Sequence, residues 1–191
     1  CSLLPPDSPE LPAGDQLLRT YLDAQLRGMG RIKDERALAE RALVLYAQAL
    51  RKEANAAYIE ELYRRRRDLS HETRAILALA IEESDGDDKM VEELLNPKIA
   101  APEAFSFYGG PARERAIRLM AWMKHKPKAR EVGTLVKELL GYQQKGHWGT
   151  TQQNAWTLLA LTRYYGAAEK VSKAERIALV RHKQQDQIRL T

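Results

Sequence analysis

The residues best suited to chemistry in this chain lie in one stretch, residues 146–154. A histidine and a tryptophan between two glycines precede a run of hydroxyl and amide side chains, and this run opens an apolar helix. Such side chains either bind the free backbone groups of a helix start or line a site. The candidate binding residues are His147, Trp148, Thr150, Thr151, Gln152 and Asn154.

Each candidate also has a structural interpretation. An imidazole can act as a general base or activate a nucleophile, but His147 has no serine, cysteine or carboxylate partner in a recognisable motif, so a structural role is expected. For the others a capping and packing cluster is favoured, because polar residues at helix starts usually satisfy their own backbone. We predict no catalytic residue. The remaining histidines are His71, His125 and His182, and without an i, i+4 pair among them no zinc site is expected.

Other metal and cofactor patterns are weak. Asp85, Asp87 and Asp88 lie around a glycine, but the ligand spacing of an EF-hand loop is missing, so we expect a solvated turn that caps the next helix. The single cysteine, Cys1, allows no internal disulfide and no cysteine-based metal site. We expect no cofactor. Cys1 is either the lipidation site of a bacterial lipoprotein or an arbitrary boundary, and the boundary is favoured.

Composition and charge bound the class of protein. A chain of 191 residues with 44% hydrophobic content is expected to be one domain, or a large piece of one, and can bury a hydrophobic core. Its net charge of +5 comes from interleaved signs, and the arginine run at residues 64–67 ends a predicted helix, where the helix dipole favours cations, so nucleic-acid binding is not expected. No stretch approaches the about 18 consecutive apolar residues of a membrane span, so no transmembrane segment is expected.

Helical periodicity dominates the rest of the chain. Four prolines predict an extended linker over residues 1–13, and residues 14–191 form one α-helical domain. Helices are predicted at residues 15–27, 34–51, 56–66, 72–83, 88–95, 113–125, 127–141, 151–165 and 172–184, with an aromatic loop at residues 100–111. No strand is predicted, so the fold class is all-α. The apolar face expected to be buried on the 151–165 helix comprises Ala155, Leu158, Leu159, Thr162 and Tyr165.

Four helices share a similar start, in which charged or amide residues lead to alanine and then an apolar residue. The alanines are Ala37, Ala75, Ala116 and Ala155, spaced 38, 41 and 39 residues apart. A period near forty residues is one helical hairpin, and the intervening helices are more charged. Two architectures satisfy this repeat: an open α-solenoid, or a partial or complete α/α toroid whose inner helices point their starts at a common hub.

A family resemblance appears in the same stretch. Residues 148–161 resemble a segment near the end of the thioester domain of α2-macroglobulins, particularly bacterial ones, and complement thioester proteins show a weaker version. In that family a Ser/Thr-Thr-Gln sequence opens a helix of the Ala-Trp-x-Leu-Leu-Ala-Leu kind. The matching residues here are Thr150, Thr151, Gln152, Ala155, Trp156, Leu158, Leu159, Ala160 and Leu161. Residues 57–62 and 72–81 also resemble the middle of that domain, so the likeness runs from about residue 15 to 166.

The resemblance implies an α/α toroid in a broad-spectrum protease trap, an endopeptidase inhibitor of the periplasm or cell envelope, and a lipid anchor on the full-length protein is expected only if Cys1 is a lipidation site. Its partners would be target proteases and the neighbouring domains of the same protein, and the candidate loop and helix start would face the hub. The reactive Cys-x-Glu-Gln sequence of the family is missing, since Cys1 is followed by Ser2, so no thioester residue is assigned. The chain then corresponds to the later half of the domain, or to a relative without a thioester.

Two other functions stay open. A self-contained helical-repeat module would bind a protein partner on its concave face. An α/α-toroid enzyme is less favoured, because such enzymes need zinc ligands, an acidic metal cluster or two carboxylates facing a cavity, and none of these patterns is evident. We therefore expect a protein that is not an enzyme.

Overall fold

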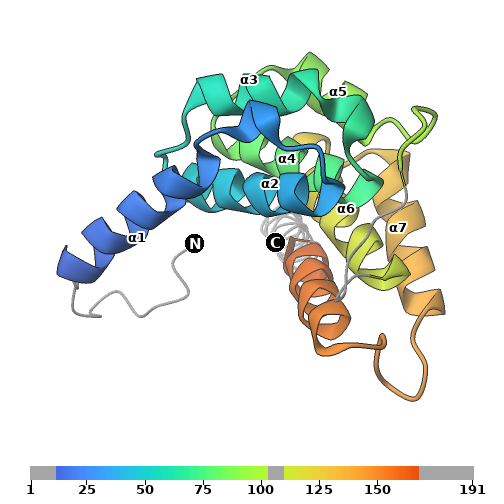
Figure 1. Cartoon of the computed structure of the whole chain (residues 1–191). Coiled ribbons are helices and arrows are strands. Elements are labelled where there is room, and N and C mark those ends of the chain that lie inside the picture. Colours follow the sequence, from blue (N-terminus) through green and yellow to red (C-terminus); the bar gives the residue numbers. More distant parts are fainter. Residues whose placement is uncertain (1–11, 103–109, 168–191) are drawn as a thin grey trace, which may run out of the picture.

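The computed structural model describes residues 12–102 and 110–167, and within these ranges the fold is all-α, as predicted (Figure 1). Two 3₁₀ turns, Met29–Arg31 and Arg66–Asp68, join helices. The predicted helix at residues 172–184 and most of the predicted aromatic loop lie outside the described residues. The α-helices are α1 (Pro12–Leu26), α2 (Glu35–Leu50), α3 (Ala56–Arg64), α4 (His71–Glu83), α5 (Asp88–Leu95), α6 (Pro111–His125), α7 (Arg130–Gly141) and an unlabelled helix over residues 151–167.

Helix α4 is the centre of the molecule. It packs between α2 and α6, and α3 and α5 lie above it in Figure 1. Ten consecutive residues of α4, 72–81, are buried, whereas α3, α5 and α7 bury two, three and four residues along one face. A helix that is buried all round must have neighbours on every side. This alternation of buried and half-exposed helices is common to a toroid and a solenoid, so the choice between them stays a prediction.

Local signals place most helix boundaries. The side chains of Asp34, Asn55, Ser70 and Asp87 each accept a backbone N–H in the first turn of α2, α3, α4 and α5. The aspartate-rich turn that we expected to cap a helix therefore does so through Asp87, whose carboxylate accepts from Lys89 N at 2.8 Å. Gly28 ends α1 with a φ of 73°, a left-handed conformation that glycine adopts without strain.

Two predicted helix starts shift by three residues. Helix α1 begins at Pro12, inside the predicted linker, because proline is tolerated in the first turn of a helix. Helix α7 begins at Arg130 rather than Pro127, because residues 126–129 form a turn in which Ala129 N donates to Lys126 O at 2.9 Å. None of the described helices is both long enough and apolar enough to cross a lipid bilayer.

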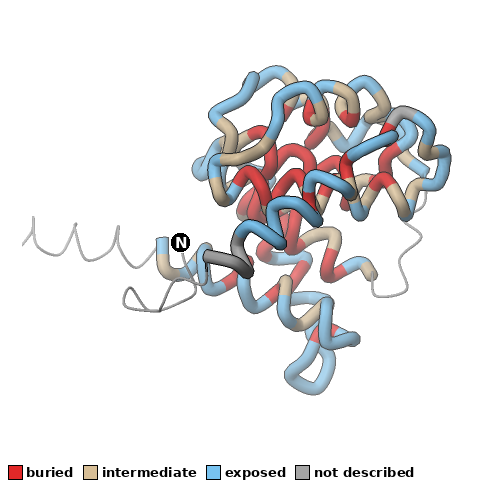
Figure 2. Tube along the Cα trace, turned by 60° about the vertical axis from the view of Figure 1, so that its left-hand side comes forward, coloured by how far each residue is buried: buried red, intermediate tan, exposed pale blue. Residues whose placement is uncertain are grey.

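The prediction of the buried face of the last described helix is wrong. Leu158, Leu159 and Tyr165 are 54%, 37% and 52% exposed, and Ala155 and Thr162 are exposed as well. The buried residues of this helix are Thr157, Ala160 and Leu161. The helix lies low in the view of Figure 1, below α2 and α6. Figure 2 shows the buried residues concentrated in the middle of the molecule, away from such edges.

Candidate functional site

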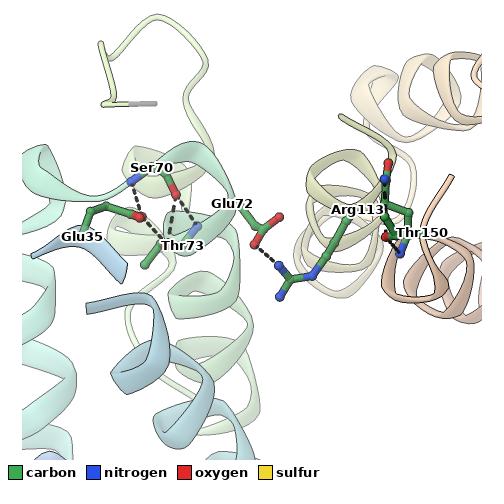
Figure 3. Close-up of polar contacts among 7 residues, drawn as sticks. Glu35, Ser70, Glu72, Thr73, Arg113 and Thr150 are labelled. Atoms are coloured by element: carbon green, nitrogen blue, oxygen red, sulfur yellow. Dashed lines mark hydrogen bonds and ion pairs between the residues drawn. The ribbon is translucent and has the colours of Figure 1, made fainter. Parts of the chain in front are cut away.

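The starts of four helices are joined in one row, which we call the helix-start row. The helices are α2, α4, α6 and the 151–167 helix, the four that carry the repeated alanine. Figure 3 shows side chains from all four of these starts, with those of α2 and α4 bonded to each other and α4 bonded to α6. Because the first N–H groups of a helix lack partners inside the helix, a row of helix starts concentrates polar groups in one place.

The first junction joins α2 to α4. One carboxylate oxygen of Glu35 accepts from the Ser70 backbone N–H at 3.2 Å and from the Thr73 hydroxyl at 2.8 Å. The Ser70 hydroxyl accepts from the Thr73 backbone N–H at 3.2 Å and donates to the Thr73 hydroxyl at 3.0 Å. Ser70 and Thr73 are each 1% exposed, so these groups depend on one another rather than on water.

The second junction is a buried ion pair between α4 and α6. Arg113 Nη1 donates to Glu72 Oε1 at 2.6 Å, and the two side chains are 10% and 6% exposed. Burial raises the pKa of Glu72, the Arg113 charge opposes this shift, and Glu114 and Glu35 add to it. Burial alone favours the neutral form of the Glu72 carboxyl. The charge of Arg113 therefore favours its ionised form.

The last junction joins α6 to the 151–167 helix. The guanidinium carbon of Arg113 lies 5.9 Å from the centroid of the Trp156 ring, within the range of a cation–π contact. Gly110, just before α6, lies so close to the Gln153 side chain that a Cβ at Gly110 would be 2.5 Å from Gln153 Oε1. The close approach explains a glycine at this position, and it ties the fourth start to the third.

Replacing Glu35 with alanine is expected to destabilise the protein by about 1–3 kcal/mol, because the buried Ser70 N–H and Thr73 hydroxyl lose their acceptor. Chemical denaturation followed by circular dichroism measures this loss. Glu35→Gln is the matched control, since its amide oxygen can still accept, and it should cost less than half as much. Equal losses in the two variants would mean that the acceptor role is not what stabilises this junction.

The predicted site residues lie beyond this row, in the loop between α7 and the 151–167 helix. Gln144 and His147 exchange two backbone hydrogen bonds of 2.9 and 3.1 Å around a tight turn. Lys145 and Gly146 in that turn have φ angles of 50° and 84°, as a type I′ turn requires. His147 is exposed, and its Nδ1 accepts from the Gly149 N–H at 3.2 Å. This contact is local and fits the structural role expected for His147.

Trp148 and Asn154 form the ordered part of the predicted site. Trp148 is buried, its indole N–H donates to Leu139 O at 2.6 Å, and its backbone N–H donates to Asn154 Oδ1 at 2.8 Å. Asn154 Nδ2 donates to Gly149 O and Thr150 O at 3.2 and 2.9 Å. The loop is thus fastened to the end of α7 and to the helix that follows it.

The remaining predicted residues separate into two groups. The Thr150 hydroxyl accepts from Gln153 N at 3.3 Å, so Thr150 caps the helix. Thr151 and Gln152 follow it in the first turn and are exposed. Capping and packing therefore account for Trp148, Thr150 and Asn154, while a binding role for Thr151 and Gln152 stays a prediction.

Sequence reasoning did not single out Glu35, Glu72 and Arg113 as site residues. A signal was present, because Glu72 and Arg113 both stand three residues before a repeated alanine and carry opposite charges in consecutive repeats. Equivalent positions of neighbouring repeats lie side by side in a stacked array, so opposite charges there predict an ion pair.

The arginine run at residues 64–67 is engaged within the molecule. Arg66 bonds to Glu93 at 2.7 Å, Arg65 donates to Met29 O at 3.3 Å, and Arg64 lies 4.0 Å from Glu60. The Tyr63 hydroxyl also donates to Glu93, and burial together with this bond raises the pKa of Tyr63 to about 12. Three of the four arginines thus have a structural role beside α3 and α5.

Comparisons with known proteins add no relative. No protein family, no curated protein and no solved structure matches this chain. A function is therefore argued from the contacts described above and from the resemblance in residues 148–161.

Proposed function

We propose that this chain is a non-enzymatic helical scaffold, the later half of the thioester domain in a bacterial α2-macroglobulin-like protease trap of the cell envelope. In that role its helices support a reactive centre located elsewhere and contact neighbouring domains. The observation that carries the proposal is the apolar face of the 151–167 helix, whose Leu158, Leu159 and Tyr165 are exposed. We call these three residues the end face.

The end face supports a role inside a larger assembly. The helix buries Thr157, Ala160 and Leu161 against the core, so it is apolar on two sides. Contiguous exposed apolar residues usually mark an interaction site, and in an array of hairpins the natural occupant of such a face is the next helical element.

The helix-start row supports the same role. Its buried carboxylate, that of Glu72, is bonded to Arg113. Its hydroxyl groups, those of Ser70 and Thr73, are bonded to each other and to Glu35. Groups satisfied in this way hold helices in register. The row is therefore a rigid support, consistent with a chain that contributes structure rather than catalysis.

A self-contained interaction module is the second candidate, and one observation favours it. The buried apolar residues form one cluster that extends from Leu26 to Leu161, so the described chain has a continuous core of its own. A domain with such a core can fold alone. The two candidates differ in one expectation. A half domain requires another helical element packed on the end face, whereas a self-contained module is stable with this face exposed.

Sedimentation of the isolated chain, with binding of a hydrophobic dye, tests the proposal. We expect the wild-type chain to self-associate and bind dye, and the double variant Leu158→Lys, Leu159→Lys to be monomeric with at least a fewfold weaker dye signal. Leu50→Lys is the matched control, because Leu50 is 48% exposed on α2, and it should behave as wild type. A monomeric wild-type chain without dye binding would favour the self-contained module.

The trap itself is tested on the full-length gene product. Co-elution of an added protease with the intact product on size exclusion is expected, together with release of one thiol after methylamine treatment. Protease trapping without thiol release would remove the covalent part of the proposal and leave the scaffold role. Absence of trapping would contradict the assignment to this family.

A further inference from the structure

A second cluster of chemical groups lies at the other ends of α4 and α6. Glu82 is in the last turn of α4, His125 is the last residue of α6, and Asp88 is the first residue of α5. One ligand atom from each of these residues lies within 4.8 Å of the other two. From the sequence, Asp88 is expected in a solvated turn, and His125 is expected to lie far from the other histidines. The fold brings them together because antiparallel hairpins return their chain ends to the same side.

The geometry of the cluster centres on the imidazole. His125 Nδ1 lies 2.6 Å from Glu82 Oε1 and 4.0 Å from Asp88 Oδ1, and Nε2 lies 3.8 Å from Glu92 Oε1. The His125 side chain is only 2% exposed, whereas the Asp88 side chain is 84% exposed. The imidazole is thus buried, while Asp88 beside it is open to solvent. An ion can reach the imidazole from the side of Asp88.

An independent observation comes from the second ring nitrogen. Among the described residues, His125 Nε2 is buried and has no hydrogen-bond partner, since the Glu92 oxygen is beyond hydrogen-bond distance. A buried polar atom without a partner costs free energy, so its presence calls for an explanation. If the imidazole is neutral and its Nδ1–H donates to Glu82, Nε2 carries no proton and is an acceptor. It then faces the Glu92 carboxylate, which is also an acceptor.

From this geometry we propose that Glu82, Asp88 and His125 form a binding site for a divalent transition-metal cation of the zinc type. The ion binds His125 Nδ1, and one oxygen from each carboxylate completes a three-residue set. One imidazole with two carboxylates suits Zn²⁺ or Co²⁺ better than Ca²⁺ or Mg²⁺, which prefer oxygen ligands alone. Water occupies the remaining position of a four-coordinate ion.

The distances fit an ion after small movements. Bonds of about 2.0–2.2 Å in a tetrahedral zinc site place neighbouring ligand atoms about 3.3 Å apart. The two distances from Nδ1, 2.6 and 4.0 Å, lie on either side of this value. Relative to Nδ1, each carboxylate oxygen reaches this value by a shift of less than about 1 Å, and the three ligand atoms start within 4.8 Å of one another. Asp88 is exposed and can make its shift without disturbing the core.

Metal binding also satisfies the second nitrogen. When the ion occupies Nδ1, the single proton of the neutral ring is carried on Nε2, and a small movement of the exposed Glu92 side chain from its present 3.8 Å lets this N–H donate to it. A metal-bound histidine usually gives its other N–H to a carboxylate in this way. Lys126 also bonds to Glu92 and holds this carboxylate beside the imidazole. Glu92 is therefore a positioning residue rather than a metal ligand.

Titration of the chelator-treated full chain with Co²⁺, followed by Zn²⁺ competition, tests the site. We expect a visible d–d absorption band of a tetrahedral cobalt site, loss of the band on adding Zn²⁺, and a Tm that rises with Zn²⁺ concentration. Asp88→Asn should weaken binding at least tenfold and His125→Asn should abolish it. Glu92→Gln should weaken binding about 10–100-fold, as loss of a carboxylate behind a metal-bound histidine does.

Two matched variants control the experiment. Asp85→Asn changes an exposed carboxylate of the same turn that pairs with Lys52 instead, and His147→Asn removes an exposed histidine. Both should bind Co²⁺ as the wild type does. If His125→Asn fails to fold, Asp88→Asn still tests the site, because that side chain is exposed. No binding at micromolar Co²⁺, or unchanged binding in Asp88→Asn, would overturn the proposal.

Discussion

Replacing Arg113 with alanine is expected to lower the free energy of unfolding by about 3–5 kcal/mol at neutral pH. The loss arises because Glu72, whose side chain is 6% exposed, must then either stay charged without the guanidinium that bonds to it at 2.6 Å or take up a proton. An uncompensated buried charge costs more than the intact pair contributes, since neither water nor another partner can replace the bond. Urea unfolding followed by tryptophan fluorescence measures the difference.

The same variant should show a characteristic dependence on pH. Burial raises the pKa of Glu72 above its ordinary value, and Arg113 opposes this shift, so the pKa rises further in Arg113→Ala. A carboxyl whose pKa is raised by folding binds more protons in the folded state, and stability falls as pH rises from the ordinary carboxyl pKa through the folded one. The loss caused by Arg113→Ala should therefore be smallest in acid and should grow as the pH rises through the pKa of Glu72. A pH-independent loss would show that Glu72 is not its cause.

Two further variants separate the buried charge from the loss of side-chain packing. Arg115→Ala removes the guanidinium of a more exposed pair on the same helix, in which Arg115 lies 2.7 Å from Glu138, and it should cost about 1 kcal/mol or less. The double variant Glu72→Gln, Arg113→Met removes both charges at similar volume and should recover most of the stability lost in Arg113→Ala. A double variant as unstable as Arg113→Ala would assign the loss to packing.

The parts of the fold that the sequence predicts well are local. Ser70 and Asp87 precede helices in the sequence, and each caps its helix in the structure, because a cap needs only the backbone of the next three residues. The apolar stripe of α2, which includes Leu38 and Leu45, is buried as its spacing indicates. On α2 the stripe has a clear polar opposite face, so periodicity alone identifies the side that packs.

The last described helix shows where periodicity fails. It carries apolar residues on more than one side, and the sequence gives no reason to choose Thr157 and Ala160 over Leu158 and Leu159 as the packed face. The choice depends on which neighbours are present, and that is a property of the whole array. Periodicity measures the width of an apolar surface, but it does not show what covers it.

The contacts of the helix-start row and of the cluster around His125 join residues far apart in the sequence, so local sequence patterns do not predict them. Glu72 and Arg113 are 41 residues apart in sequence, and Glu82 and His125 are 43 apart. Both separations are close to the repeat of about forty residues, so both are contacts between equivalent parts of neighbouring hairpins. The repeat was visible in the sequence, and applying its spacing to charged residues as well as alanines would have paired Glu72 with Arg113. The same spacing of 41 residues takes Glu82 to Met123, two residues before His125, so that pair is displaced from the register of the alanines.

Replacing Trp148 with alanine is the second large expected effect, a loss of about 3–5 kcal/mol. Trp148 is 7% exposed, and its ring fills the space between the loop and the end of α7. Trp148→Phe keeps most of the ring but loses the indole N–H bond to Leu139 O, which still accepts from Tyr142 N at 3.2 Å, so it should cost about 1 kcal/mol. Thermal and chemical denaturation measure the loss of stability in each variant. The loss in Trp148→Phe gives the effect of the hydrogen bond, and the further loss in Trp148→Ala gives the effect of the ring.

The same loop then distinguishes a support from a binding surface. If the loop supports the helix that carries the end face, Trp148→Ala should weaken self-association, because that helix loses its anchor to α7 through Trp148 and Asn154. The exposed side chains of Thr151 and Gln152 make no such anchor, so Thr151→Ala and Gln152→Ala should leave both stability and association unchanged. We expect this first pattern. The opposite result, normal stability with weakened association in Gln152→Ala, would mean that the start of the helix touches the partner directly and that the end face is only part of the interface.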